Sequence, residues 1–278
     1  MIDHPFDCTP LAPAIGLEVR GLDLAAPPAA ETTAAINHAF LEHHVLVFRD
    51  QRMTAAQQLA FAKTMGEPAI YPFVQGLDGF PAITPIIKLP HETVNFGGLW
   101  HSDTAYLERP PKATMLLARE VPPVGGDTLF ASQVVALDTL SDGMKRLLGR
   151  LCAVNASAKA DVTRTREDRI DKDSGADNKS FEAIHPVIRT HPESGAKALY
   201  VNRGHTVAFE GLSEDESAGL LEFLFRHQIR EEFQCRVRWA PGTLVMWDNR
   251  ACQHYPINDY HGHRREMHRI TLKGDVPR

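Results

Sequence analysis

Two side chains that commonly bind metals, His101 and Asp103, are separated by a single residue in the segment Leu99–Asp103. In an extended segment, alternate side chains leave the same face, and their Cα atoms stand about 6–7 Å apart. A third ligand, for which His254 is the candidate, would complete a 2-His-1-carboxylate set, which is typical of non-haem Fe(II) oxygenases. Without such a partner, a pattern this short is more often a surface pair or a hydrogen-bonded core pair.

A second group of residues could bind an anion. Arg265 and Arg269 lie on one face of a strand predicted at 265–272. They could project to solvent, as arginines usually do, or they could bind carboxylates through their planar guanidinium groups. Thr128, in the segment Gly125–Phe130, could add a hydroxyl donor to the same anion. Either feature alone is weak evidence.

Short apolar or alternating segments punctuated by Gly and Pro predict a mainly β fold with flanking helices, a sandwich or barrel. Strands are expected at 15–20, 45–48, 115–118, 187–190, 198–201, 233–239, 244–246 and 265–272. Helices are expected at 30–43, from Thr54 to Gly66, from Ser141 towards Leu148, and after Ser213, and two of them begin with capping boxes, Thr54/Gln57 and Ser213/Glu216. The turn-like composition of 257–262 predicts that the His254 segment and the last strand are hairpin neighbours.

The composition is that of an ordinary globular protein. The chain has 278 residues, of which 43% are hydrophobic and 23% charged, with a net charge of −5. One domain over residues 1–278 is expected. The absence of a Lys/Arg run argues against nucleic acid as a partner, and the absence of a long apolar run argues against a membrane span. The sequence leaves open whether the chain forms a homo-oligomer.

Four scattered cysteines and an N-terminus without the pattern of a signal peptide predict a cytoplasmic protein with unpaired thiols. Residues 156–180 are rich in charges of both signs and poor in large aliphatic side chains, so they are either a lid loop or a solvated insertion without a role. His261 and His263 share a metal-ligand spacing but lie in turn-like sequence, so both are expected to be exposed. The same expectation covers six further histidines: His43, His44, His185, His191, His205 and His268.

An ordered set of motifs resembles the taurine dioxygenase family of Fe(II)/2-oxoglutarate-dependent enzymes. The set comprises Trp100-His101-Ser102-Asp103, Pro110-Pro111, Gly125-Gly126-Asp127-Thr128, Trp247-Asp248-Asn249-Arg250 with Gln253-His254, and Arg265 with Met267-His268-Arg269. The motifs span nearly the whole chain, in family order and at family-like spacing.

The resemblance implies a double-stranded β-helix (jelly-roll) core and a full set of site residues. Fe(II) would be held by His101, Asp103 and His254, and 2-oxoglutarate by Arg265 and Thr128 at its distal carboxylate, with Arg269 close to both cosubstrate and substrate. The family consumes O₂, releases succinate and CO₂, and hydroxylates a substrate C–H bond.

Two departures from the family pattern bear on the substrate. The taurine enzymes, which this chain resembles, have a His and an Asn at two places where this chain has other residues. Tyr71 stands at the first place, and Gly97-Gly98 lie near the second. We therefore expect a small anion other than taurine, a sulfonate, sulfate ester or aryloxy/alkyl carboxylate. It would be bound by Arg269 and Tyr71, with Phe73 and Phe96 as further apolar candidates or as ordinary core residues.

Two alternatives stay open. One is a non-catalytic jelly-roll protein that binds a metal or an anion, although the arginines and Thr128 argue against it. The other keeps the cofactors but leads to desaturation, ring closure or epimerisation.

Overall fold

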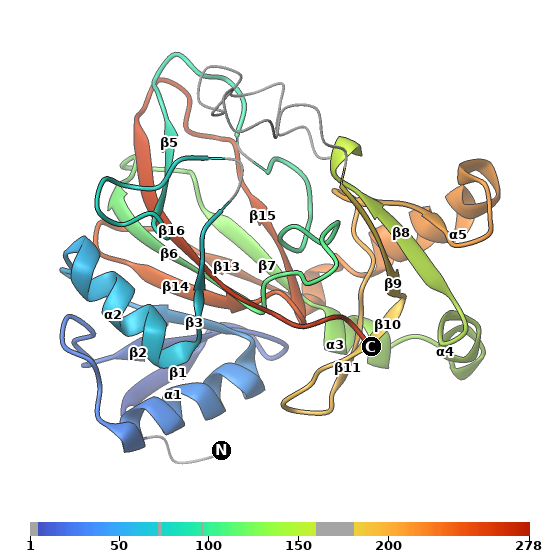
Figure 1. Cartoon of the computed structure of the whole chain (residues 1–278), viewed down its shortest axis with the longest axis horizontal. Helices are drawn as coiled ribbons and strands as arrows, with labels where there is room; N and C mark the ends of the chain where they lie inside the picture. Colours follow the sequence, from blue (N-terminus) through green and yellow to red (C-terminus); the bar gives the residue numbers. More distant parts are fainter. Residues whose placement is uncertain (1–4, 72–73, 96, 160–180) are drawn as a thin grey trace.

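Two mainly antiparallel sheets pack face to face in the computed structural model, which describes residues 5–71, 74–95, 97–159 and 181–278 (Figure 1). The larger sheet has the strand order β1 (Asp7–Pro10), β2 (Leu17–Arg20), β3 (Val45–Phe48), β14 (Leu244–Asp248), β6 (Ala113–Glu120), β16 (Arg265–Leu272) and β4 (Pro68–Ala69), with β5 (Thr84–Lys88) also paired to β16. The smaller sheet has the order β13 (Gln234–Val237), β7 (Thr128–Ser132) and β15 (Cys252–Pro256). Apolar side chains of both sheets, among them Val245, Met267 and Phe130, form one core cluster between them.

Helices α1 (Ala30–His43) and α2 (Ala55–Met65) cover the outer face of the larger sheet (Figure 1). Phe40 of α1 and Phe61 of α2 join Phe48 and Leu272 of the sheet in a second core cluster. The predicted capping box at Thr54 is present at the start of α2, where both reciprocal hydrogen bonds are made.

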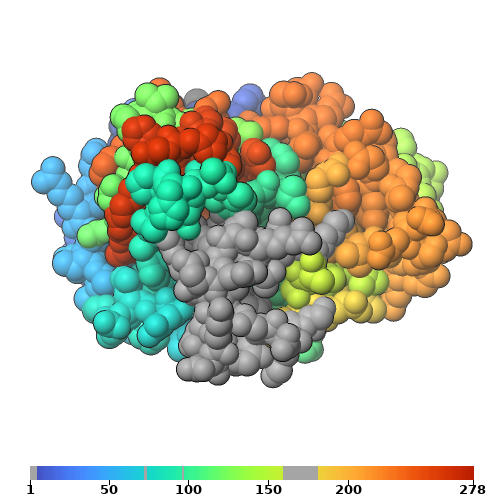
Figure 2. All heavy atoms as spheres, turned by 90° about the horizontal axis from the view of Figure 1, so that it is seen from above, coloured from blue at the N-terminus to red at the C-terminus, as the bar shows by residue number. Residues whose placement is uncertain are grey.

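A third layer lies beyond the smaller sheet, at the end of the molecule opposite α1 (Figures 1 and 2). It contains the sheet β12 (Thr206–Phe209), β8 (Cys152–Ala156) and β9 (Glu182–Pro186), the hairpin β10 (Ile188–Thr190) and β11 (Lys197–Leu199), and the helices α3 (Gln133–Asp138), α4 (Asp142–Leu148) and α5 (Glu214–His227). Short 3₁₀ turns occupy Ser157–Lys159 and Glu231–Phe233. The second predicted capping box, Ser213 with Glu216, opens α5.

The predicted fold class, mainly β with flanking helices and a jelly-roll core, is confirmed, although the sheets do not close into a barrel. The predicted hairpin between the His254 segment and the last strand is wrong. Strand β15 pairs with β7, whereas β16 pairs with β6, β5 and β4 in the other sheet. The intervening turn therefore carries the chain from one sheet to the facing one, because both strands have apolar side chains to bury in the shared core.

No helix among the described residues combines the length and the apolar character that a membrane span requires. Most of the predicted lid, residues 160–180 of 156–180, lies outside the described residues, as do Phe73 and Phe96.

Candidate active site

His101 and His254 are held opposite each other by their own backbones. They form an isolated antiparallel bridge in which His101 N–H donates to the His254 carbonyl at 3.1 Å and His254 N–H donates back to the His101 carbonyl at 2.9 Å. Residues that pair in this way carry their side chains on the same face. The two imidazole centroids are consequently 4.2 Å apart.

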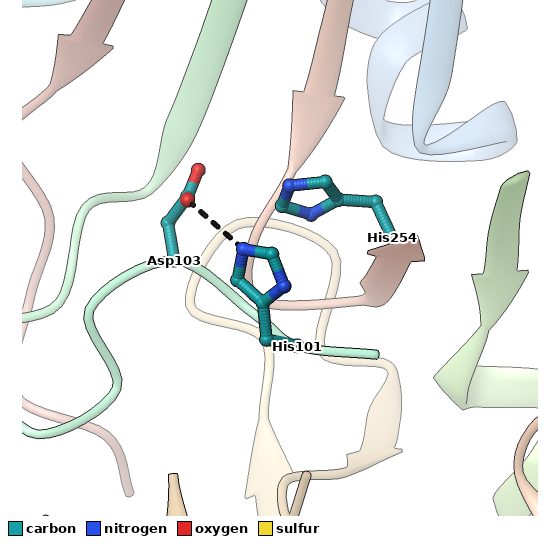
Figure 3. Close-up of side chains that lie close together, drawn as sticks. All are labelled: His101, Asp103 and His254. Atoms are coloured by element: carbon teal, nitrogen blue, oxygen red, sulfur yellow. Dashed lines mark ion pairs between the residues drawn. The ribbon is translucent and has the colours of Figure 1, made fainter. Parts of the chain in front are cut away.

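Asp103 completes a cluster of three candidate metal ligands (Figure 3). His101, Asp103 and His254 each offer one ligand atom, and these atoms lie within 4.8 Å of one another. The Nδ1 atom of His101 lies 2.7 Å from the Leu99 carbonyl, which fixes the ring proton on Nδ1. The unprotonated Nε2 atom then lies 3.8 Å from Oδ1 of Asp103. The geometry brings together the three residues that the sequence singles out.

The protonation states that the surroundings impose suit metal ligands. Burial lowers the pKa of His101 and lowers that of His254 well below its usual value, so both imidazoles are neutral at neutral pH. Burial by itself would raise the pKa of Asp103, but the Arg269 guanidinium, the two neighbouring imidazoles and the hydrogen bond from Thr114 together hold that pKa below its usual range. Neutral imidazoles and an ionised carboxylate are the forms that bind a metal ion.

Arg265 and Arg269 are both buried, with 6% of each residue exposed, so the alternative that they project to solvent is wrong. Neither Nε atom has a hydrogen-bond partner within the described part of the chain. Nη2 of Arg269 lies 2.9 Å from Oδ1 of Asp103. A buried guanidinium group without a full set of acceptors is costly, so the arrangement favours a bound anion.

Thr128, at the start of β7, is placed to serve the same anion. Its Oγ1 atom accepts a hydrogen bond from Nε1 of Trp239 at 3.0 Å, which leaves the hydroxyl hydrogen to be donated elsewhere. A single cavity of about 60 Å³ unites these groups. Its lining comprises His101, Asp103, His254, Thr128, Arg265 and Arg269 together with Ile86, Leu116, Trp239, Trp247 and Pro256.

These residues fit an Fe(II) ion and a dicarboxylate. The histidines and the aspartate match the ligand set of the non-haem iron oxygenases. The two buried arginines and the Thr128 hydroxyl supply donors for two carboxylate groups in the same cavity.

Tyr71 contacts the site from its edge. Its ring centroid lies 4.9 Å from Cζ of Arg269, a cation–π distance, and it is 8% exposed. It lines a neighbouring cavity of about 270 Å³ rather than the one that contains the candidate ligands. A hydrogen bond joins its hydroxyl to that of Tyr106, which the sequence did not single out.

The aromatic neighbours of Arg265 were also missed from the sequence. Its Cζ atom lies 5.6 Å from the ring centroid of Trp239 and 5.8 Å from that of Tyr260. Tyr260 in turn donates to the Asn95 side chain at 2.8 Å. Trp239 stands in an alternating strand pattern and Tyr260 in a turn, so neither position carried a signal for this contact.

The histidine expectations are partly wrong. His261 and His263 are exposed as predicted. His44, His185, His191 and His205 are buried instead. His191 has a partner that the sequence did not reveal, because its Nε2 atom lies 2.9 Å from Oδ2 of the buried Asp248.

Comparisons with known proteins agree with this geometry. Residues 7–271 match the protein family described as "Taurine catabolism dioxygenase TauD, TfdA family". An alpha-ketoglutarate-dependent sulfate ester dioxygenase of Pseudomonas putida is 36% identical over 98% of this chain and 90% of its own length, alpha-ketoglutarate being 2-oxoglutarate. An alkylsulfatase of Acinetobacter baylyi is 33% identical over 94% of this chain and 83% of its own length. The crystal structure of a taurine dioxygenase from Burkholderia xenovorans superposes with a TM-score of 0.83, at 31% identity over 98% of this chain and 90% of that one.

Proposed function

Because the chain belongs to the taurine catabolism dioxygenase TauD, TfdA family, we propose that it oxidises alkyl sulfate esters at the carbon that bears the sulfate. The enzyme is a 2-oxoglutarate-dependent non-haem iron dioxygenase that acts on a small organic anion and uses Fe(II), 2-oxoglutarate and O₂. One oxygen atom enters succinate as CO₂ leaves, and the other hydroxylates the substrate carbon. The hydroxylated carbon then loses sulfate and the hydroxyl proton, which leaves an aldehyde.

One observation carries the assignment of roles: a single cavity is lined by the three candidate ligands and by two buried arginines whose Nε atoms have no acceptor among the described residues. We assign Fe(II) to His101, Asp103 and His254. When bound, the iron and 2-oxoglutarate supply the oxidation chemistry.

The protein's part is to bind, orient and exclude water. We assign the distal carboxylate of 2-oxoglutarate to Arg265 and Thr128, which line the cavity and both contact Trp239. Arg269, beside Asp103, is placed to bind the anionic groups nearest the iron. The indole rings of Trp239 and Trp247 line the same cavity and limit access of water to it.

The substrate class rests on the chain's own departures from the taurine enzymes and on its relatives. A taurine amine would need polar partners, but this chain has Gly97 and Gly98 near the place where the taurine enzymes have an Asn, and Tyr71 where they have a His. Tyr71 instead offers an aromatic face against the Arg269 guanidinium. An anionic headgroup with an apolar body suits these surroundings, and the two relatives named for sulfate esters have substrates of that kind.

The experiment compares matched substrates by their products. Hexyl sulfate, hexanesulfonate, taurine, 2,4-dichlorophenoxyacetate and neutral hexyl acetate are each supplied with Fe(II) and 2-oxoglutarate. Succinate is measured together with sulfate, sulfite, or the phenol. We expect hexyl sulfate to give the highest kcat/KM and to release equimolar sulfate and hexanal, and His254→Ala to abolish turnover.

Higher kcat/KM with taurine would contradict the proposed substrate class, and equal turnover of hexyl acetate would remove the anion-binding role of Arg269. An alkene in place of the aldehyde would favour desaturation. Metal and 2-oxoglutarate binding without turnover of any member would favour the non-catalytic binding protein instead.

We further propose that residues 1–278 act as one domain, since the family match extends over 7–271. A cytoplasmic location is proposed from the four cysteines, which are all unpaired thiols.

A further inference from the structure

The two carboxylate oxygens of Asp103 have different surroundings. Oδ2 accepts a hydrogen bond from the Thr114 hydroxyl at 2.5 Å. Oδ1 faces the opposite way, 3.8 Å from Nε2 of His101 and 2.9 Å from Nη2 of Arg269. Only Oδ1 is therefore turned towards the other candidate ligands.

The direction of the Thr114 hydrogen bond is dictated by Asn249, which follows β14. The Asn249 Oδ1 atom lies 3.1 Å from Nε1 of Trp247 and 3.3 Å from the Asp103 backbone nitrogen. Both of these groups can only donate, so the Asn249 amide is fixed with its oxygen towards them. Its Nδ2 atom must then donate to the Thr114 hydroxyl oxygen, at 3.0 Å. With its oxygen engaged as an acceptor, Thr114 has its hydrogen directed at Asp103.

Water cannot substitute for this chain of hydrogen bonds. Thr114 is 0% exposed, Asn249 1%, Trp247 3% and Asp103 4%. The backbone reinforces the arrangement, because Thr114 on β6 is in register with Trp247 on β14. In addition, the hydroxyl of Ser102, the neighbour of Asp103, donates to the Asn249 carbonyl at 2.6 Å. The segment that carries Asp103 is thus attached to Asn249 at two points and to Thr114 at a third.

We propose that Thr114 and Asn249 are positioning residues of the metal site. They engage Oδ2 and leave Oδ1 towards His101 and His254, so that Asp103 binds the metal through one oxygen. This inference rests on the proposed role of Asp103 as a ligand. Partners of this kind orient metal ligands, and their loss typically weakens metal affinity by about 10–100-fold.

The test measures metal affinity without turnover. Apoprotein is titrated with Co²⁺ alone, and the visible d–d spectrum is recorded. Thr114→Val keeps the side-chain shape but removes the hydroxyl, so we expect about 10–100-fold weaker Co²⁺ binding and an altered spectrum as Oδ2 becomes free. Thr114→Ser restores the hydroxyl, and we expect it to restore both affinity and spectrum.

Thr206→Val provides the matched control. Thr206 is also 0% exposed, and its hydroxyl likewise donates to a buried side-chain oxygen, Oδ1 of Asn155 at 2.7 Å. The Thr206→Val variant should have a lower unfolding temperature but the same Co²⁺ affinity as the unmodified protein. If Thr114→Val does not fold, Thr114→Cys, with a weak S–H donor, carries the same expectation with a smaller effect.

The outcomes distinguish failure of the proposed positioning role from failure of the proposed metal site. If Asp103→Ala abolishes Co²⁺ binding but Thr114→Val binds Co²⁺ as Thr206→Val does, the positioning role is overturned and the metal site stands. If Asp103→Ala binds Co²⁺ like the unmodified protein, the metal site itself is overturned. Weaker binding by Thr114→Val that Thr114→Ser rescues supports the proposal.

Discussion

Replacement of Arg265 tests how the cosubstrate is anchored. Its guanidinium group is buried near the rings of Trp239 and Tyr260, with Cζ at 5.6 and 5.8 Å from their centroids, and its Nε atom has no partner among the described residues. Arg265→Met keeps the apolar length of the side chain but removes the charge and all of its donors. Arg265→Lys keeps the charge but loses the planar fork that can donate two hydrogen bonds to one carboxylate.

The expected magnitude follows from the bond that is lost. A hydrogen bond between charged groups contributes about 1.5–3 kcal/mol, and each 1.4 kcal/mol is about a factor of ten in affinity. Arg265→Met should therefore weaken 2-oxoglutarate binding by about one to two orders of magnitude. The 2-oxoglutarate affinity of Arg265→Lys should lie between that of Arg265→Met and that of the unmodified protein.

Binding is measured by calorimetry with Mn²⁺ in place of Fe²⁺, and the KM for 2-oxoglutarate by succinate release. Arg189→Met is the control, because Arg189 is also a fully buried arginine but pairs with Asp275, away from the cavity. It should reduce stability and leave 2-oxoglutarate affinity unchanged. Unchanged affinity in Arg265→Met would refute the anchor, and Arg269 would be the next candidate.

Three further predictions concern other positions. Burial lowers the pKa of His44 from 6.5 to about 4. As the pH falls from about 6.5 to about 4, the imidazole is therefore protonated in the unfolded chain but not in the folded one, and the free energy of unfolding decreases. Asn tolerates the φ of 61° at this position, so His44→Asn should fold. Between about pH 7 and pH 5, its free energy of unfolding in urea should fall by about 2 kcal/mol less than that of the unmodified protein. An equal fall in both proteins would contradict this. At Gly97, with φ +70°, an added Cβ would lie 2.8 Å from Cε1 of His101, so Gly97→Ala should weaken Co²⁺ binding whereas Gly98→Ala should not. Tyr71→Ala should raise KM for hexyl sulfate by about three- to tenfold, as expected for loss of a cation–π contact, with 2-oxoglutarate KM unchanged; an unaltered hexyl sulfate KM would remove Tyr71 from the substrate site.

Helix starts and the buried faces of strands could be predicted from the sequence, because both depend on residues that are close together in the chain. The capping boxes at Thr54 and Ser213 mark helix starts through hydrogen bonds that span only three residues. The alternation along β16 also holds, since Arg265, Met267 and Arg269 are buried whereas Glu266 and His268 between them are partly exposed. A period of two identifies the face but not what lies opposite it, so sequence left the choice between solvent and cavity open.

Long-range pairing was not predictable from such patterns. The turn composition of 257–262 correctly indicates a reversal but does not specify the sheet in which the next strand pairs. Thr114 illustrates the same limit, because it precedes an ordinary apolar strand segment and gives no sign of a polar role. The role that we propose for Thr114 depends on Asn249, 135 residues further along the chain, which strand register brings into contact with it.

The candidate metal site combines both kinds of information. The spacing of His101 and Asp103 is local and can be read from the sequence, but His254 reaches them only through the two-way backbone bridge to His101. That bridge lies at the edge of the smaller sheet, whereas Arg265 and Arg269 come from the facing sheet. The candidate ligands and the two buried arginines therefore meet only when the two sheets pack. A substitution in the shared core that separates the sheets should accordingly weaken metal and 2-oxoglutarate binding together, although it touches neither.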